Sequence, residues 1–428
     1  MMKKRFFVSI LAGMMTLAAA AQISTTLSPY SQFGMGVLSD QSLGFNRGMG
    51  GVAYGLRSGK FINMKNPASY SAVDSLTMLF DLGVAGQISN FKEGNKSRNT
   101  KTGNFDYAVA SFRLLPHVGV AAGVVPFSNI GYSYYSQQNI GSSITVSQEN
   151  HDGDGGFSQA FVGAGWELAK GFSVGFNISY FWGKYTKSIE IVSSDTYVNT
   201  VLRKYSGNAS SYKLDIGAQW QRMVSKDDLL TVGMTASIGH RLKGDAELTT
   251  TNTNSMTSTV TSSLHTVEDA FSIPTTIGIG ASVLHKNSLT AAFDYTYQHW
   301  SNIDYPAFNK STYELVGGYF KNRHQVAAGV DWLPNPVGRK FLELVHYRMG
   351  VSYATPYYKI GSSNGPSELA VSAGFGIPLY NAWNNRSTLN ITAQWVRFAA
   401  PNSIKENTFR VTLGLTFNER WFAKWKVD

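Results

Sequence analysis

The chain has 428 residues, no cysteine, a formal charge of +10 and only 15% charged residues, against about 25% for ordinary soluble domains. The lack of cysteine excludes disulfides, thiolate chemistry and a lipid anchor attached through cysteine. Lys and Arg do not gather into a stripe, so the positive charge indicates an anionic lipid surface or an acidic ligand, and not nucleic acid.

The N-terminus predicts export. Residues 3–5 are basic, residues 6–17 are apolar, and Ala19 and Ala21 complete a cleavage signature, so residues 1–21 are expected to be a signal peptide. No later stretch reaches the roughly eighteen apolar residues that a membrane helix needs. A secreted soluble protein or an outer-membrane β-barrel remains. The 42 Gly, 22 Tyr, 25 Phe and 9 Trp favour the barrel, which needs aromatic girdles and a small-residue inner wall.

Residues 22–74 are expected to form a plug, or hatch, inside the barrel. They are rich in glycine, including Gly48, Gly50 and Gly51, and they lack sustained alternation. A barrel of this width would otherwise enclose a water-filled hole. Near its end, Asn66-Pro67-Ala68 is either a turn into the first strand or a device that fixes how the plug enters the wall. Both interpretations stay open.

From residue 75 to 428 the pattern predicts a transmembrane antiparallel barrel. Apolar residues alternate with Gly, Ser, Thr and Asn, as lipid-facing and lumen-facing positions should. In the last strand Leu413 falls on the apolar face and Thr412 on the other. Fourteen strands are expected, near 75–91, 104–114, 117–137, 156–169, 171–193, 209–224, 228–250, 271–284, 288–304, 323–334, 343–360, 367–380, 387–399 and 408–421.

Connection lengths predict the orientation of the barrel. Short turns at 115–117, 170–171, 225–227 and 285–287 should be periplasmic, and the long connections 138–155, 251–270 and 305–322 extracellular. Residues 249–263 are almost all Thr, Ser and Asn, so this connection is expected to be a mobile loop.

Val125-Pro126-Phe127-Ser128 is the candidate for an opening in the wall. A proline inside a membrane-spanning strand removes a hydrogen-bond donor of the ladder and is tolerated only at bulges, kinks or openings. The segment is therefore either a lateral gate or a bulge without a role in transport.

No catalytic, metal or cofactor signature is present. The eight His residues are scattered, without an HxxxH or HExxH pair, and no phosphate-binding loop occurs. His299-Trp300-Ser301 could suggest a Ser–His hydrolase, but Trp300 is better interpreted as an interfacial girdle residue. We do not expect an enzyme.

Four local patterns resemble the long-chain fatty acid transporter family of outer-membrane proteins, the FadL/TodX type. They are Gly48–Gly51 with Asn66-Pro67-Ala68; Val125–Ser128; Ile273-Pro274 to Gly280 with Phe293-Asp294 and Trp300-Ser301; and Tyr347–Gly350 with Thr355-Pro356. The patterns follow the family's order. The resemblance implies a fourteen-stranded barrel with an internal hatch and a gap in the third strand through which an apolar ligand leaves sideways into the membrane.

Two functions follow as hypotheses. The first is a passive channel for hydrophobic small molecules such as long-chain fatty acids, set among outer-membrane lipid and lipopolysaccharide. A carboxylate ligand would need a basic partner, for which Arg47, Lys65 and Arg241 are candidates. The second is a barrel that docks protein partners in an outer-membrane secretion or assembly complex, as similar barrels of the type 9 secretion system do.

Overall fold

The computed structural model describes residues 28–139, 146–309, 312–380, 386–401 and 403–420. The expected signal peptide lies outside these residues. Within them, fourteen strands pair antiparallel in chain order, and the last pairs with the first through Gly83 and Gly414, which closes the barrel. The expected strand number is confirmed. The strands are β2 (Thr77–Glu93), β3 (Lys96–Leu115), β4 (Val118–Asn139), β5 (Val146–Ala169), β6 (Phe172–Ser193), β7 (Thr200–Met223), β8 (Asp228–Ser237), β13 (Thr275–His285), β14 (Leu289–His299), β17 (Arg323–Trp332), β18 (His346–Ala354), β21 (Ser367–Tyr380), β22 (Arg386–Ala399) and β23 (Lys405–Arg420).

The alternation along each strand places apolar side chains outside and small or polar ones inside. On β23 Leu413 is 45% exposed, whereas its neighbour Thr412 is 1% exposed. The same contrast separates Phe176 and Ile178 from the buried Asn177 on β6. An apolar belt around a closed barrel is the surface that lipid requires, so the chain is an outer-membrane barrel.

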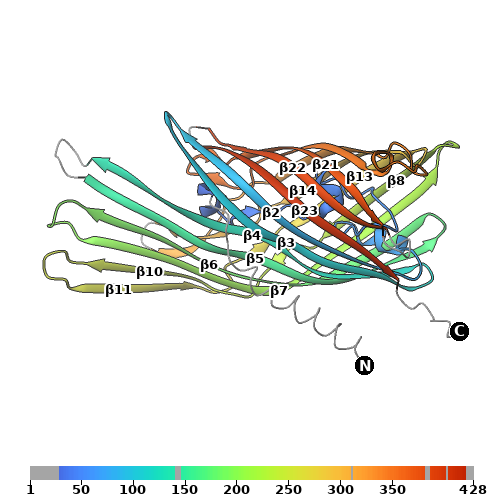
Figure 1. Ribbon diagram of the computed structural model, residues 1–428. Coiled ribbons are helices and arrows are strands. Elements are labelled where there is room, and N and C mark those ends of the chain that lie inside the picture. Colours follow the sequence, from blue (N-terminus) through green and yellow to red (C-terminus); the bar gives the residue numbers. More distant parts are fainter. Residues whose placement is uncertain (1–27, 140–145, 310–311, 381–385, 402, 421–428) are drawn as a thin grey trace, which may run out of the picture.

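The expected long loops are wrong, because most of these residues continue the wall. β4 and β5 extend beyond the membrane belt, and residues 251–263 belong mainly to β10 (Ala246–Thr253) and β11 (Val260–Val267). Figure 1 shows this hairpin projecting beyond most of the barrel, beside β7. Thr and Ser lie on both faces of this hairpin, so its sequence lacks the alternation of apolar and polar residues that predicts a strand. The hairpin forms because β7 supplies backbone hydrogen-bond partners along the whole of β10. Residues 305–322 contain a second hairpin, β15 (Tyr305–Asn309) and β16 (Thr312–Val316).

The remaining elements are short. β9 (His240–Arg241) pairs with β12 (Ser272–Ile273), and β19 (Lys359–Ile360) with β20 (Ser363–Asn364); α3 (Phe341–Leu344) follows β17. No helix among the described residues is both long and apolar enough to cross a membrane.

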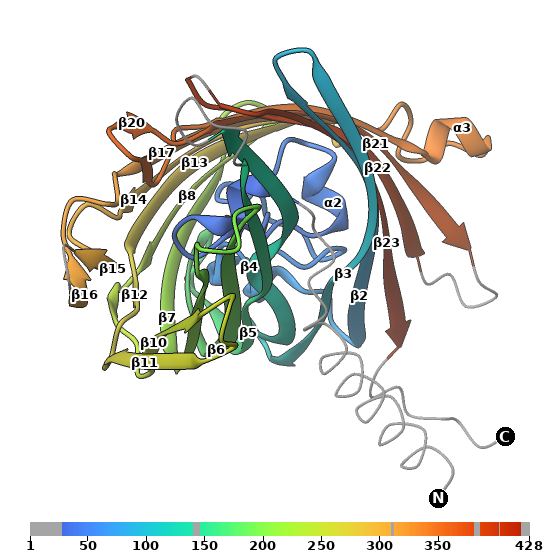
Figure 2. The ribbon, with the colours of Figure 1, turned by 90° about the vertical axis from the view of Figure 1, so that its left-hand side faces the viewer.

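Residues 28–74 lie inside the barrel, as Figure 2 shows, and form the expected luminal hatch. Their ordered pieces are η1 (Pro29–Gln32), β1 (Val37–Leu38), α2 (Gly44–Arg47) and η2 (Pro67–Ala72). Most hatch side chains are buried against the inner wall. The hatch therefore fills the end of the lumen near the short turns, which is the periplasmic end on the predicted orientation, and its first residues reach into the other end, the outer lumen.

Candidate functional site

The barrel wall splits between β3 and β4. The two strands pair from Leu115 and Val118 only as far as Ala108 and Val124, although β3 extends to Lys96 and β4 to Asn139. Beyond Val124 no β3–β4 pairing exists among the described residues. We call this region the split.

A bulge marks the start of the split. The register between β4 and β5 shifts between Pro126 and Ser128, so Phe127 has no partner residue on β5. Pro126 cannot donate to a ladder, and the extra residue bends the strand. Phe127 is buried and meets Phe181 edge-on, with ring centroids 5.0 Å apart. The sequence motif Val125–Ser128 therefore sits where the wall opens.

The hatch covers the β4 edge that β3 leaves free. Hatch strand β1 pairs with β4, Val37 opposite Asn129 and Leu38 opposite Ser128. The Ser39 N–H donates to the Phe127 carbonyl at 2.9 Å. The Ser128 hydroxyl donates to the Met35 carbonyl at 2.7 Å. One short hatch segment thus takes the place of a wall strand.

An aromatic cluster fills the outer lumen beside the split, and we call it the outer cluster. Phe127 and Tyr132 of β4 belong to it. Trp300 also belongs to it and is 0% exposed, so its expected place in the interfacial girdle is wrong; the chain turns inward after β14 and carries this ring into the lumen. The other large aromatic members are Phe157, Phe181, Tyr185, Phe271, Tyr313, Phe320, Tyr357 and Tyr358.

Lys187 of β6 is buried beside these rings without an acidic partner among the described residues. Its ammonium donates to the Gln32 and Gly34 carbonyls at 2.8 and 3.2 Å and lies 4.7 Å from the Tyr185 ring centre. Sequence reasoning missed this residue. The sequence offers only one sign of it: Lys187 falls on the lumen-facing side of β6, whereas the alternating apolar residues of that strand fall on the lipid-facing side.

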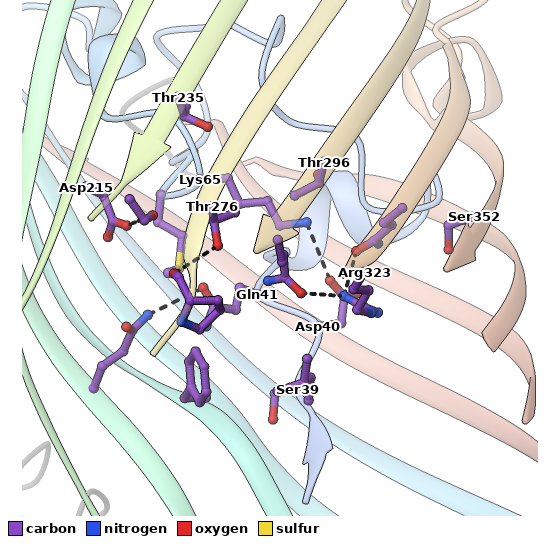
Figure 3. Close-up of a pocket in the computed structure, with 18 of the residues that line it drawn as sticks. Ser39, Asp40, Gln41, Lys65, Asp215, Thr235, Thr276, Thr296, Arg323 and Ser352 are labelled. Atoms are coloured by element: carbon purple, nitrogen blue, oxygen red, sulfur yellow. Dashed lines mark hydrogen bonds and ion pairs between the residues drawn. The ribbon is translucent and has the colours of Figure 1, made fainter. Parts of the chain in front are cut away.

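A chamber of about 160 Å³ with both polar and apolar lining residues lies between the hatch and the wall. Figure 3 shows Asp40 and Lys65 of the hatch facing Arg323 and Asp215 of the wall across it. The charges are largely compensated: Lys65 lies 3.9 Å from Asp40, and Arg323 lies 3.0 Å from Glu368. The rest of the lining is apolar in part, because Leu38, Phe127 and Phe161 also face the chamber. Burying the charged pairs away from water is costly, so they disfavour a ligand that is apolar throughout.

Ion pairs and hydrogen bonds hold the hatch to the wall. Arg47 is fully buried and pairs with Asp106 of β3 and with Asp40. Burial raises the pKa of Asp40, but the charges of Lys65 and Arg47 and hydrogen bonds from Ser42 outweigh it and hold that pKa below its ordinary value. On another side, the Asp294 carboxylate of β14 accepts the Ala53 and Tyr54 N–H groups at 2.6 and 3.0 Å.

The expected hatch residues make close backbone contacts. Gly50 and Gly51 have φ of +71° and +80°, which favours glycine, and the Gly50 N–H donates to the Ser372 hydroxyl at 2.9 Å. Gly48 lies in the ordinary helical region. Asn66 caps η2 by accepting the Ala68 N–H at 3.2 Å, and its amide donates to the Tyr54 carbonyl at 2.9 Å. Pro67 and Ala68 follow at the start of η2 and press on the wall.

The three candidate partners of a ligand carboxylate do not lie together. Arg47 is occupied by its two acids, and Lys65 lines the chamber. Arg241 is exposed on β9. Of the three, only Lys65 faces open space inside the barrel.

Comparisons with known proteins agree with this architecture. The family model described as BamG matches residues 1–428. A FadL homologue from Pseudomonas aeruginosa superposes with a TM-score of 0.62 at 11% identity, covering 90% of this chain and 99% of that one. The toluene transporter TodX of P. putida superposes with a TM-score of 0.59 at 11% identity, covering 89% of this chain and 98% of that one. The toluene transporter TbuX of Ralstonia pickettii superposes with a TM-score of 0.57 at 12% identity, covering 87% of this chain and 97% of that one. No curated protein matches. These similarities confirm the FadL/TodX-type fold.

Proposed function

The chain belongs to the BamG family, and we propose that it is an outer-membrane channel for hydrophobic small molecules, long-chain fatty acids among them, which releases them sideways through the split. One observation carries this proposal. The wall opens between β3 and β4 directly beside the outer cluster, with Phe127 belonging to both. Once the hatch segment that covers the split moves aside, an apolar molecule can pass from these aromatic side chains to lipid without entering water.

The rest of the lumen supports a sideways exit over an axial one. The chamber lining includes charged pairs, and the hatch below it is fixed by buried contacts on several sides. By contrast, the split is covered by hatch residues 28–39, through the pairing of β1 and hydrogen bonds such as those from Ser28 and Ser39 to β4. Because this cover is hatch and not a wall strand, it can move aside without breaking the pairing of neighbouring wall strands.

Lys187 is the residue that we propose for a ligand carboxylate. Its ammonium lies among aromatic rings, and its nearest oxygen partners are neutral carbonyls of the hatch. A carboxylate is a stronger partner for a buried ammonium than a carbonyl is. Binding would therefore draw Lys187 from Gln32 and Gly34, in the same hatch segment that covers the split.

A disulfide tests the sideways exit. The chain has no cysteine, so Val37→Cys with Asn129→Cys gives one possible bridge, at positions that already pair across β1 and β4. In cells lacking their own fatty acid porin, we expect the wild type to take up labelled oleate. The oxidised variant should lose uptake, and reduction should restore it. Each single variant is the control. Full uptake by the oxidised variant would contradict the exit through the split.

A docking role is the second candidate, and the surface outside the membrane favours it. Exposed apolar side chains gather at the tips of the β6–β7 and β10–β11 hairpins, among them Tyr197 at 80% and Met256 at 65% exposure. The Ser255 hydroxyl donates to the Val198 carbonyl at 2.9 Å, which joins the two tips. Apolar patches away from lipid mark protein interaction sites.

The edge of β11 adds to this candidate. Among the described residues β11 pairs with β10 alone, and residues 249–267 carry no Asp, Glu, Lys or Arg. Charges and prolines usually protect such edges from strand addition. Purification from native membranes separates the two candidates. A stoichiometric partner that is lost on Ser262→Pro but kept on Ser262→Ala, together with wild-type protein that imports no oleate, would establish docking.

A further inference from the structure

An apolar hollow lies on the outer face of the barrel, where β5, β6, β7 and β8 run side by side. Its volume is about 520 Å³. Small side chains line its floor and large exposed ones surround it; the floor includes Ala164, Ala218 and Ala236, and the rim Trp166, Phe176 and Met234.

The hollow exists because this part of the wall is thin. The inner face of the same strands carries Gly165, Gly175 and Gly217 in one row of register. The hatch presses on these glycines from inside, with the Pro67 backbone on Gly165 and Gly175 and the Asn66 side chain on Gly217. With alanine outside and glycine inside, little more than one layer of backbone separates the hollow from the hatch.

On the predicted orientation, the hollow lies toward the periplasmic side of the membrane belt. Trp166 is four residues before the Lys170–Gly171 turn, which is at most about 13 Å along the strand. Trp220 of β7 is exposed nearby, opposite Phe172. Exposed tryptophans at this level are typical of the interface between lipid tails and headgroups.

Two positive charges stand at the periplasmic edge of the hollow. Lys170 is exposed in the β5–β6 turn, and Arg222 follows Trp220 on the outward face of β7. Neither forms an ion pair among the described residues. The acids of this edge have other partners: Glu167 lies 3.7 Å from Arg57 inside the barrel, Asp228 binds His285 at 2.7 Å, and Asp227 lies 3.9 Å from Lys286.

We propose that the hollow holds one acyl chain of a phospholipid from the inner leaflet, with the lipid phosphate between Lys170 and Arg222. Apolar surfaces do not attract one another in a bilayer through the hydrophobic effect, so close packing and polar contacts decide which molecules stay bound. The hollow supplies the packing surface, and the two cations supply charge that complements a phosphate. This site is independent of whether the barrel transports or docks.

The test uses the full-length protein in vesicles of phosphatidylglycerol whose acyl chain carries a diazirine. After illumination, peptides from β5–β8 should be labelled several-fold more than peptides from β21–β23. Ala218→Phe fills the hollow and should reduce the β5–β8 label to the level of β21–β23. Ala373→Phe is the matched control, because Ala373 is an exposed outward alanine on β21, and it should leave the label unchanged.

The phosphate contact has its own readout. Lys170→Gln with Arg222→Gln should reduce by several-fold the phosphatidylglycerol that remains bound after extensive washing in dodecyl maltoside. Even labelling around the wild-type barrel would overturn the proposal, as would equal labelling of β5–β8 in Ala218→Phe and the wild type. A protein partner that is lost on Ala218→Phe, without any loss of lipid label, would also overturn it.

Discussion

Gly175 of β6 and Pro67 of the hatch meet through their backbones. A Cβ placed on Gly175 would clash with the Pro67 carbonyl and would lie 2.6 Å from the Ala68 nitrogen. The same kind of contact recurs around the wall, so the hatch is packed as closely as a protein core. The other glycines of this belt are Gly119, Gly165, Gly233, Gly329 and Gly350.

Gly175→Ala should loosen the hatch without breaking the barrel. Overpacking costs about 1–3 kcal/mol, and here the added methyl meets backbone, which cannot rotate away. We expect faster trypsin cleavage at Arg57 and Lys60 of the hatch, with unchanged heat-modifiability of the barrel on gels. Gly86→Ala is the control, because a Cβ at Gly86 meets nothing within 4 Å. Equal cleavage of the two variants would contradict a tightly packed hatch.

Asp294→Ala should also release the hatch, for a different reason. It leaves the buried Ala53 and Tyr54 N–H groups without an acceptor, at about 1–3 kcal/mol for each donor. Asp294→Asn keeps one acceptor oxygen and should destabilise the hatch less than Asp294→Ala does. Urea titration followed by trypsin cleavage gives the order of stability. If Asn proves as harmful as Ala, the role of Asp294 lies in its charge and not in these two hydrogen bonds.

The sequence predicted the barrel but not how the lumen is filled. Alternation is imposed by lipid on one face, and it identified Leu413 and Thr412 as outward and inward. It could not tell whether an inward residue meets water or the hatch. Thr412 proves to lie against Arg47, 3.4 Å from its guanidinium, whereas Ser352 lines the open chamber. Whether an inward residue contacts the hatch or open space depends on where the distant hatch segment folds. The sequence around the inward residue itself does not show this.

The candidate site was predictable only where one residue type imposes a local constraint. Pro126 indicated a break in the ladder, because it lacks the N–H that the ladder needs. Lys187 and the tips of the β10–β11 hairpin were missed. Their significance comes from neighbours far away in sequence: the Gln32 carbonyl for Lys187, and Val198 for Ser255.

Two neighbouring residues on β18 test the inside and outside of the wall. Val351 is exposed on the lipid face, and Ser352 lines the chamber. Val351→Arg should destabilise the barrel by about 2–4 kcal/mol near the middle of the membrane. Ser352→Arg should cost much less, since part of the chamber lining is polar and the chamber has room. Folding titrations in lipid vesicles that give the reverse order would invert the assignment of the two faces.

The orientation of the barrel has a direct test. The turn between β10 and β11, residues 254–259, lies at the far end of the projecting hairpin, whereas the β7–β8 turn at residues 225–227 lies at the opposite end of the wall. A tag inserted in the first turn should bind antibody on intact cells. A tag in the second should bind only after the outer membrane is opened. The opposite pattern would reverse the barrel in the membrane.

Pro126→Ala examines the proposed exit without a disulfide. The substitution restores a backbone N–H donor at the bulge. We therefore expect β4 to extend its pairing with β3 beyond Val124 and so to narrow the split. We expect the variant to fold, to reach the surface and to remain heat-modifiable, but to import labelled oleate several-fold more slowly than the wild type. Pro274→Ala, at a proline between β12 and β13, is the control and should import normally. Unchanged import by folded Pro126→Ala would mean that the split is not the path, and that the ligand leaves past the hatch. If the wild type itself imports no oleate, the result favours the docking role. The pairing of β1 with β4 would then keep the split closed while the protein functions.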